Sequence, residues 1–352
     1  MRGRGDRLEA LLAERELDRL LITDLTNVRY LTGFTGTNGA CVCGPGIRLF
    51  LTDFRYTERA ATEVEGWEPI TLSGDWLGGI AEQLAGKVGF EDDQMPVRMH
   101  TKLVEKLADG VETVAAGGLV EQLRRVKDEG ELAAIAAASE LADGVWTWSL
   151  ERGLAGRSER DVALAAEARI RELGGEPSFP AIVAAGPNGA LPHAEPGERE
   201  IGRGELVVFD MGAKLDGYCS DGTRTYATGE PGEQARAVYE VVLNAQAAAL
   251  AAIKAGAKGE DVDGVARKLI EEAGHGERFG HGLGHGVGLE VHEGPRLSPR
   301  ADDVLAPNEV VTVEPGVYLP GELGVRIEDL VVVTEDGLRN LSALPKELQL
   351  VE

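Results

Sequence analysis

Acidic side chains in the second half of this 352-residue chain occupy positions that could hold metal ions. Asp210 and Asp221 flank Asp216-Gly217, a dipeptide that favours a tight hairpin turn. Across such a hairpin both aspartates project from one face, opposite or one diagonal apart, with roughly 4.5 to 8 Å between side-chain bases. Such a pair persists if cations lie between the carboxylates or if water screens them. The apolar run at residues 206–209 indicates burial, which weakens the case for screening by water, but the aspartate pair by itself leaves both alternatives open.

Three of the six histidines lie in one glycine-rich stretch, residues 281–293: they are His281, His285 and His292. Alternating glycines break a helix and let the backbone pass close to a bulky group. Imidazole is both a transition-metal ligand and a proton carrier near neutral pH. A single histidine is usually a satisfied surface or core residue, but three in one such loop indicate a site. His193 lies in another loop marked by glycine and proline.

Two glutamates border apolar segments closer to the C-terminal end. Glu314 ends an apolar run, and Glu328 precedes a buried run. A buried carboxylate is costly unless a cation or a positive side chain accompanies it. Arg326 and Glu328 are two apart on one predicted strand and share a face. An ion pair of Arg326 with either glutamate is therefore the alternative to a metal, but it leaves the aspartates and histidines unexplained.

Together these residues form a carboxylate-rich set with one imidazole, which suits two hard or borderline divalent ions such as manganese, cobalt, iron or zinc. The expected metal ligands are Asp210, Asp221, His285, Glu314 and Glu328. Two such ions share a water, lower its pKa and present hydroxide to a carbonyl. The expected reaction class is metal-assisted hydrolysis.

The elements that must position these residues fall into two predicted domains, residues 1–122 and 123–352. Residues 5–120 alternate short helical and strand signals, which indicates a small α/β domain. A long helical stretch at residues 121–150 then changes the character of the chain.

The predicted elements of the second domain form a weak two-fold repeat. A helix near residues 159–173 is followed by a hairpin at 206–227. Helices near 233–255 and 260–273 then precede a second hairpin at 310–333. Each hairpin carries two of the carboxylates, so the repeat divides the ligand set between two halves.

Bulk properties exclude several classes of partner. The net charge of −24 repels phosphate backbones, so we expect no nucleic acid. No apolar run reaches membrane-spanning length, and the first residues show no apolar signal core. Cys41 and Cys43 share one face of a predicted strand and are interpreted as core residues, and the odd total of three favours reduced thiols. The expected location is the cytoplasm.

The order of the five ligands resembles that of the "pita-bread" metallopeptidase family, which includes proline dipeptidase, aminopeptidase P and methionine aminopeptidase. Residues 27–34 and 52–56 also resemble the N-terminal domain of the proline-specific members. The resemblance therefore covers nearly the full chain. It implies an α/β N-terminal domain plus an α+β C-terminal pita-bread (creatinase/aminopeptidase) domain with an internal pseudo-two-fold.

The same resemblance implies a role for each site residue. Two divalent ions per subunit, manganese, cobalt or zinc, would be bridged by Asp221 and Glu328. Asp210 would complete one metal site, with His285 and Glu314 completing the other. Glu314 would also shuttle the proton of the metal-bridging hydroxide.

The resemblance also implies roles for residues around the metals. His193 and His292 would bind substrate and steady the carbonyl and the tetrahedral intermediate. His281 would line the site, and Arg326 would orient the substrate or the neighbouring ligands.

The implied activity is hydrolysis of the Xaa-Pro bond in peptides or dipeptides by a homodimer. The leading domain and Arg326 argue against a methionine aminopeptidase-like enzyme, and the full ligand set argues against a catalytically silent binding protein. Arg296 could bind the free carboxylate of a dipeptide, or it could be a solvated loop arginine. The choice between dipeptidase and aminopeptidase stays open, as does whether the N-terminal domain completes a partner's site.

Overall fold

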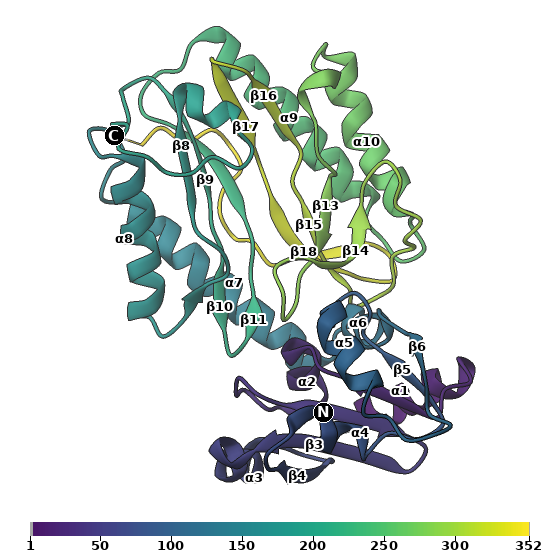
Figure 1. Ribbon diagram of the computed structural model, residues 1–352. Helices are drawn as coiled ribbons and strands as arrows, with labels where there is room; N and C mark the ends of the chain where they lie inside the picture. Colours follow the sequence, from purple (N-terminus) through teal and green to yellow (C-terminus); the bar gives the residue numbers. More distant parts are fainter. Residues whose placement is uncertain (1–2, 352) are drawn as a thin grey trace. The chain divides into compact units, whose positions relative to one another are not determined.

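The computed structural model describes residues 3–351 and divides the chain into two compact units, Met1–Arg124 and Arg125–Glu352 (Figure 1). Each unit has its own sheets and its own apolar core. No helix in the described part of the chain combines the length and apolarity needed to cross a bilayer.

The first unit is built on one six-stranded sheet of order β4-β3-β2-β1-β5-β6. The neighbours β1, β5 and β6 run parallel, whereas β2 is antiparallel to both of its neighbours. The strands are β1 (Arg19–Ile22), β2 (Ala40–Gly44), β3 (Ile47–Asp53), β4 (Glu68–Leu72), β5 (Lys87–Phe90) and β6 (Glu112–Ala115). The helices are α1 (Arg4–Glu14), α2 (Leu25–Thr32), η1 (Phe54–Tyr56), α3 (Thr57–Glu63), α4 (Trp76–Ala81), α5 (Val97–Val104) and α6 (Leu119–Arg125). Cys41 and Cys43 of β2 are free and fully buried, as predicted.

The single helical stretch predicted at residues 121–150 is wrong, because the chain forms two helices there. α6 ends at Arg125, and α7 (Glu129–Leu150) starts anew. The Asp128 side chain caps α7 by accepting from the Glu131 amide at 2.9 Å, and the Glu131 side chain accepts from the Asp128 amide at 3.0 Å. This reciprocal cap satisfies amides that a continuous helix would have paired internally.

The first half of the second unit contains α7, α8 and a hairpin that ends at the site. The hairpin predicted at residues 206–227 is present: β9 pairs with β12, and an inner pair closes at Asp216 and Gly217, both at positive φ. The elements are α8 (Glu159–Glu172), β7 (Glu176–Pro177), β8 (Ile182–Ala185), η2 (Gly186–Ala190), β9 (Leu206–Asp210), β10 (Ala213–Leu215), β11 (Tyr218–Cys219) and β12 (Thr223–Ala227). They form sheets of order β12-β9-β8 and β11-β10-β7.

The second half contains α9, α10 and a five-stranded sheet of order β14-β13-β15-β18-β19. The hairpin predicted at residues 310–333 is divided: β15 pairs with β18, but β16 and β17 form a separate two-stranded sheet. Arg326 ends β17 and Glu328 precedes β18, so they do not lie on one strand as predicted. The elements are α9 (Glu233–Ala252), α10 (Gly259–Glu272), η3 (Gly276–Arg278), β13 (Gly284–Gly286), β14 (Glu293–Leu297), β15 (Val310–Val313), β16 (Gly316–Leu319), β17 (Leu323–Arg326), β18 (Asp329–Val333) and β19 (Leu338–Asn340).

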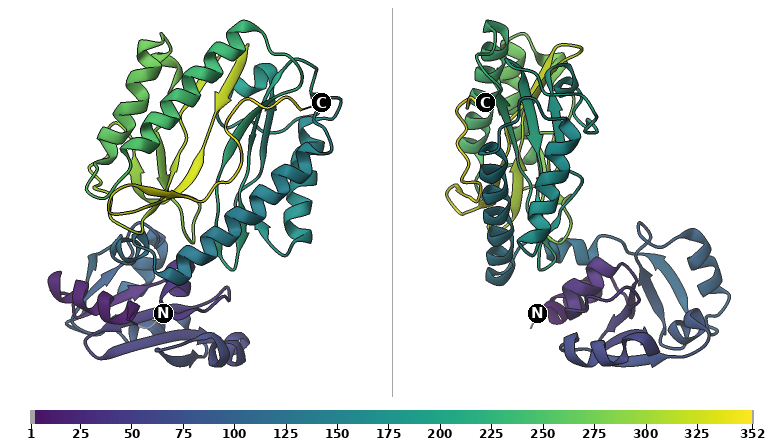
Figure 2. Two further views of the ribbon diagram at one scale, coloured as in Figure 1. Left: turned by 180° about the vertical axis from the view of Figure 1, so that it is seen from behind. Right: turned by 90° about the vertical axis from the view of Figure 1, so that its left-hand side faces the viewer.

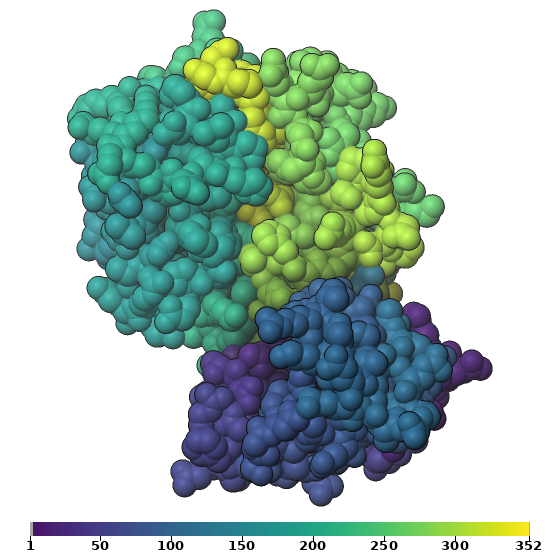
Figure 3. Space-filling model, in the orientation of Figure 1, coloured from purple at the N-terminus to yellow at the C-terminus, as the bar shows by residue number. Residues whose placement is uncertain are grey.

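The two halves repeat one scaffold, a long helix followed by a 14-residue helix and a sheet. α8 and α10 start 100 residues apart and bury matching positions, which are Val162, Ala166 and Ile170 in α8 and Val262, Ala266 and Ile270 in α10. Figures 1 and 2 show the teal helices α7 and α8 beside the first-half strands and the green helices α9 and α10 beside the second-half strands. In the space-filling view the two halves meet along a seam (Figure 3).

Candidate metal centre

The two aspartates lie where β9 meets β12. Asp210, the last residue of β9, pairs in register with Thr223, so Asp221 lies one diagonal away. The Met211 amide donates to the Gly222 carbonyl at 3.1 Å, which keeps the two arms together around the carboxylates. Both aspartates are buried. The predicted sharing of one face is therefore present in its diagonal form.

His285 turns one ring nitrogen toward the carboxylates. Its Nδ1 donates to the Gly286 carbonyl at 3.0 Å, so Nε2 is the nitrogen that faces Asp221 and Glu314 and that would bind a metal once deprotonated. Nε2 lies 3.6 Å from an oxygen of Asp221 and 3.3 Å from one of Glu314. The His285 amide donates to Thr312 Oγ1 at 3.1 Å, so β15 fixes the backbone as well.

Glu314 and Glu328 are both placed by their backbone amides. The Glu314 amide donates to the Leu283 carbonyl at 2.8 Å, which ties it to the histidine loop. The Glu328 amide donates to the Thr223 carbonyl at 3.0 Å, and Thr223 Oγ1 donates to the Glu328 carboxylate at 2.8 Å. The second glutamate is thus joined to the aspartate hairpin.

The five predicted ligands converge. One possible ligand atom from each of Asp221, His285 and Glu328 lies within 4.8 Å of the others. Asp210 Oδ1 is buried and has no hydrogen-bond partner among the described residues. Burial and then mutual repulsion raise the pKa values of Asp221 and Glu328 well above their usual range. Carboxylates packed in this way fit divalent cations, which would neutralise them and take up the unpartnered oxygen.

Charge is shared differently between Glu314 and His285. Burial is the largest influence and disfavours the charged form of both groups, but the hydrogen bond and the charge attraction between them, with smaller contributions from other neighbours, together outweigh it. The pKa of Glu314 is lowered as a result, and the pKa of His285 is raised. Glu314 is therefore the carboxylate of the set that most readily stays ionised.

Arg326 pairs with an aspartate, so the predicted alternative of an ion pair with Glu314 or Glu328 is wrong. Its Nη2 lies 2.5 Å from Asp210 Oδ2, and its Nε donates to Thr223 Oγ1 at 3.0 Å. The backbone turn at residues 327–328, between β17 and β18, aims the two side chains differently. The buried guanidinium therefore orients a ligand from the other half of the unit.

Tyr318 is a site residue that the sequence reasoning missed. Its hydroxyl lies 2.9 Å from His281 Nε2 and accepts from Arg326 Nη1 at 3.0 Å. A phenol in the otherwise apolar strand β16 was the available signal. His281 thus lies beside the ligands but contacts them through a network.

The remaining predicted residues form an exposed rim. The His292 ring lies 4.3 Å from the His285 ring, centroid to centroid. Arg296 faces His285 across the β13–β14 pair, and its guanidinium makes no hydrogen bond to the described residues. His193 is exposed too, and the carbonyl of the preceding Pro192 accepts from Arg326 Nη1 at 3.2 Å.

Comparisons with known proteins identify a family for each part of the chain. Residues 133–335 match the model of metallopeptidase family M24, and residues 4–126 match the creatinase/prolidase N-terminal domain. An uncharacterized peptidase of Bacillus subtilis, YqhT, is 41% identical over 97% of this chain and 98% of its own. The Xaa-Pro dipeptidase of Pyrococcus furiosus is 34% identical over 99% of this chain and 100% of its own.

Solved structures show the same fold over almost the whole chain. An Xaa-Pro dipeptidase from Bacillus anthracis superposes with a TM-score of 0.96 at 39% identity, covering 99% of both chains. An X-Pro aminopeptidase from Thermotoga maritima superposes with a TM-score of 0.91 at 35% identity, covering 99% of this chain and 100% of its own. The predicted fold class, two domains with a pita-bread second domain, is confirmed. The chain belongs to metallopeptidase family M24 and carries a creatinase/prolidase N-terminal domain.

Proposed function

We propose that this chain is a two-metal exopeptidase that hydrolyses the bond between an N-terminal residue and a following proline. The observation that carries the proposal is the convergence of Asp210, Asp221, His285, Glu314 and Glu328, with a buried oxygen of Asp210 left without a partner. The similar Xaa-Pro dipeptidases and the X-Pro aminopeptidase support the proline specificity.

The ligand set has the composition that a pair of divalent ions requires. Four carboxylates and one imidazole, from Asp210, Asp221, His285, Glu314 and Glu328, would together hold the ions. Manganese, cobalt or zinc suits this mixture of oxygen and imidazole donors. When bound, the ions would acidify a water and polarise the scissile carbonyl.

The chain's own residues would move the protons and hold the substrate. Glu314, the acid whose pKa is lowered, would take a proton from the attacking water and return it to the departing proline nitrogen. His193 and His292, on the exposed rim, would bind the substrate carbonyl. Arg326 would hold Asp210 in place. His281, bonded to Tyr318, would line the pocket beside Arg326.

We further propose that the preferred substrates are Xaa-Pro dipeptides. Their carboxylate directly follows the proline ring and needs a cation at the edge of the site. Arg296 is exposed, faces His285 across the ladder and has a guanidinium free of hydrogen bonds to the described residues. A homodimer in the cytoplasm is proposed from the family resemblance, and three free cysteines suit a reducing compartment.

The direct test compares an Xaa-Pro dipeptide with an Xaa-Pro-Xaa tripeptide, each with Mn²⁺ and with a chelator. We expect metal-dependent cleavage, faster for the dipeptide, and no cleavage of an Xaa-Ala dipeptide. No cleavage of either proline substrate with metal present would reject the proposed function.

Matched arginine variants test the role of Arg296. Arg296→Met should raise KM for the dipeptide about tenfold or more and change KM for the tripeptide much less, because only the dipeptide loses its carboxylate partner. Arg300→Met, an exposed change just beyond the end of β14, should change neither. Equal effects of Arg296→Met on both substrates would refute carboxylate binding.

A further inference from the structure

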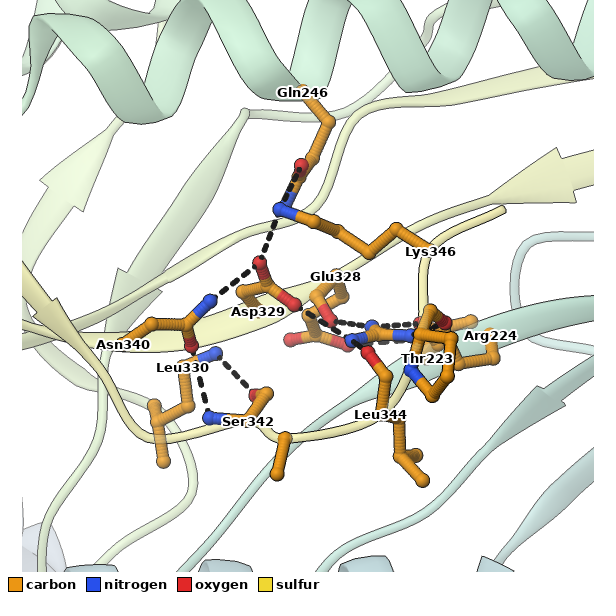
Figure 4. Close-up of polar contacts among 12 residues, drawn as sticks. Thr223, Arg224, Gln246, Glu328, Asp329, Leu330, Asn340, Ser342, Leu344 and Lys346 are labelled. Atoms are coloured by element: carbon orange, nitrogen blue, oxygen red, sulfur yellow. Dashed lines mark hydrogen bonds and ion pairs between the residues drawn. The ribbon is translucent and has the colours of Figure 1, made fainter. Parts of the chain in front are cut away.

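A buried guanidinium lies beside the backbone of Glu328 (Figure 4). It belongs to Arg224 of β12, and every one of its N–H groups has an acceptor. Nε donates to the Pro345 carbonyl at 3.1 Å; Nη1 to the carbonyls of Thr223, at 3.0 Å, and Glu328; and Nη2 to Asp329 Oδ1 at 2.8 Å and the Leu344 carbonyl at 2.9 Å. Because all of its N–H groups are bonded, this guanidinium fixes the relative positions of its acceptors in addition to supplying a charge.

The acceptors of Arg224 belong to both halves of the second unit. Thr223 lies in the sheet of the first half, and Glu328 and Asp329 lead into the sheet of the second half. The ligand set is divided in the same way, with the aspartates on one side and the histidine and glutamates on the other. The distance between the aspartates and Glu328 therefore depends on the contacts that join these two sheets, and Arg224 supplies a central one.

Asp329 neutralises the charge of Arg224 and is itself fully buried. Its Oδ1 accepts from Arg224, and its Oδ2 accepts from Lys346 Nζ at 2.9 Å and Asn340 Nδ2 at 2.8 Å. Lys346 also donates to the Gln246 side chain at 3.2 Å. Figure 4 shows Asn340 and Lys346 beside Asp329, with Gln246 of α9 beside Lys346.

We call residues 340–351 the C-terminal strap, because they contact both halves. The Leu330 amide of β18 donates to Ser342 Oγ at 3.0 Å, on the second half. The Ala343 amide donates to Asp143 of α7 at 2.7 Å, and the Val351 amide donates to the Ala227 carbonyl of β12 at 2.8 Å, both on the first half. The match to the M24 model ends at residue 335, before the strap.

We propose that Arg224 is a positioning residue, which the C-terminal strap and Asp329 lock in place so that Glu328 meets the aspartates at the distance metal binding requires. The inference rests on the proposed function, since it assigns Glu328 to the metals. Arg224 touches neither substrate nor the ligand carboxylates. It acts through the backbone carbonyls of Thr223 and Glu328, and Thr223 in turn holds the Glu328 carboxylate.

Arg224→Lys is the sharpest variant, because lysine keeps the positive charge beside Asp329 but cannot reproduce the planar fork. We expect the affinity for Co²⁺, measured by calorimetry, to fall at least tenfold, as for other changes to groups that orient metal ligands. The visible spectrum of the cobalt-loaded protein should change, and kcat should fall more than KM rises. Arg199→Lys is the control, since Arg199 pairs with Glu205 in the same unit and touches no proposed ligand.

A second variant guards against a folding defect. Arg224→Met combined with Asp329→Leu removes both charges of the buried pair, a change that proteins often tolerate, and leaves the partly exposed ammonium of Lys346 with Gln246 as its partner. Its thermal unfolding without metal shows whether it folds, and its cobalt affinity should also fall at least tenfold. Cobalt affinity and spectrum within twofold of wild type in both variants would overturn the inference. Wild-type protein that neither binds Co²⁺ nor cleaves Xaa-Pro would instead overturn the proposed function.

Discussion

The two units both bury carboxylates, but different groups satisfy them. In the first unit Glu91, which is 2% exposed, accepts from the amides of Thr23 and Asp24 at 2.7 and 2.8 Å and from the Asn27 side chain at 2.7 Å. In the second unit Asp210 keeps an oxygen without any described partner, and Asp221 faces Glu328. The carboxylate of Glu91 is satisfied by hydrogen bonds from the protein, whereas the second group sets four carboxylates around one arginine, Arg326.

Two adjacent residues of the second unit show the same contrast between a carboxylate that the protein satisfies and one that it does not. Asp329 accepts from Arg224, Lys346 and Asn340, so it is neutralised by the protein. Its neighbour Glu328 has a carboxylate that accepts from Thr223 and otherwise faces the other ligands. Burial of an acid is therefore a weak sign of metal binding, and unsatisfied oxygens among several acids are a stronger one.

The largest expected effect comes from the acid assigned to proton transfer. Glu314→Gln keeps the shape of the side chain but removes the base, so kcat should fall by roughly 10³-fold or more while the fold persists. Steady-state kinetics on an Xaa-Pro dipeptide, with circular dichroism as the folding control, checks this. Activity within tenfold of wild type would refute the role of Glu314.

The buried carboxyl group of Glu91 predicts that the stability of the first unit depends on pH. Burial raises the pKa of Glu91 to about 7, above its unfolded value of about 4.5. Between these values the folded unit keeps a proton that the unfolded chain has released. The contribution of Glu91 to the free energy of unfolding is therefore full below pH 4.5 and falls by up to ~3 kcal/mol as pH rises to 7. Hydrogen exchange in β1 and β5 measures this, and Glu91→Gln should remove the slope; the same slope in that variant would contradict the assignment.

The candidate metal ligands predict that a divalent ion stabilises the second unit and leaves the first unit unchanged. Free Mn²⁺ at a hundred times its Kd should stabilise that unit by about 2.7 kcal/mol, or roughly 5 to 10 °C in Tm. Hydrogen exchange resolved by peptide can compare the units. Equal protection of β1 and β9 would show that the ion acts elsewhere. Asp221→Asn should lose most of the gain.

The smallest expected effect is a gain in stability of Asp221→Asn when no metal is present. In metal-free protein at pH 8, Asp221→Asn should raise stability by about 1 kcal/mol, because it removes one charge from a group whose members repel one another. Chemical denaturation with a chelator present measures it. A loss of stability would mean that the protein alone already satisfies Asp221.

Much of the site could be predicted from the sequence, because its ligands break local patterns. Asp210 ends an apolar strand and Glu314 directly follows another, His285 lies among glycines, and Asp216 with Gly217 closes the predicted turn. Each signal lies within a few residues of chain. The order of the ligands then carried the family resemblance.

The missed features depend on contacts between distant segments. The Arg326 partner is Asp210, 116 positions away on another sheet, so the local pattern favoured the glutamates instead. The helix break before Glu129 depends partly on the Asn308 carbonyl, which accepts from the Lys127 amide. Local periodicity carries no information about such partners.

The central claim is that carboxylates unsatisfied by the protein mark the place of the cations. Crystals grown with Mn²⁺ and measured at a wavelength where manganese scatters anomalously test it most directly. The account predicts two anomalous peaks bounded by Asp210, Asp221, His285, Glu314 and Glu328, and none at Glu91. Saturating Mn²⁺ that leaves those five side chains without a peak would contradict it.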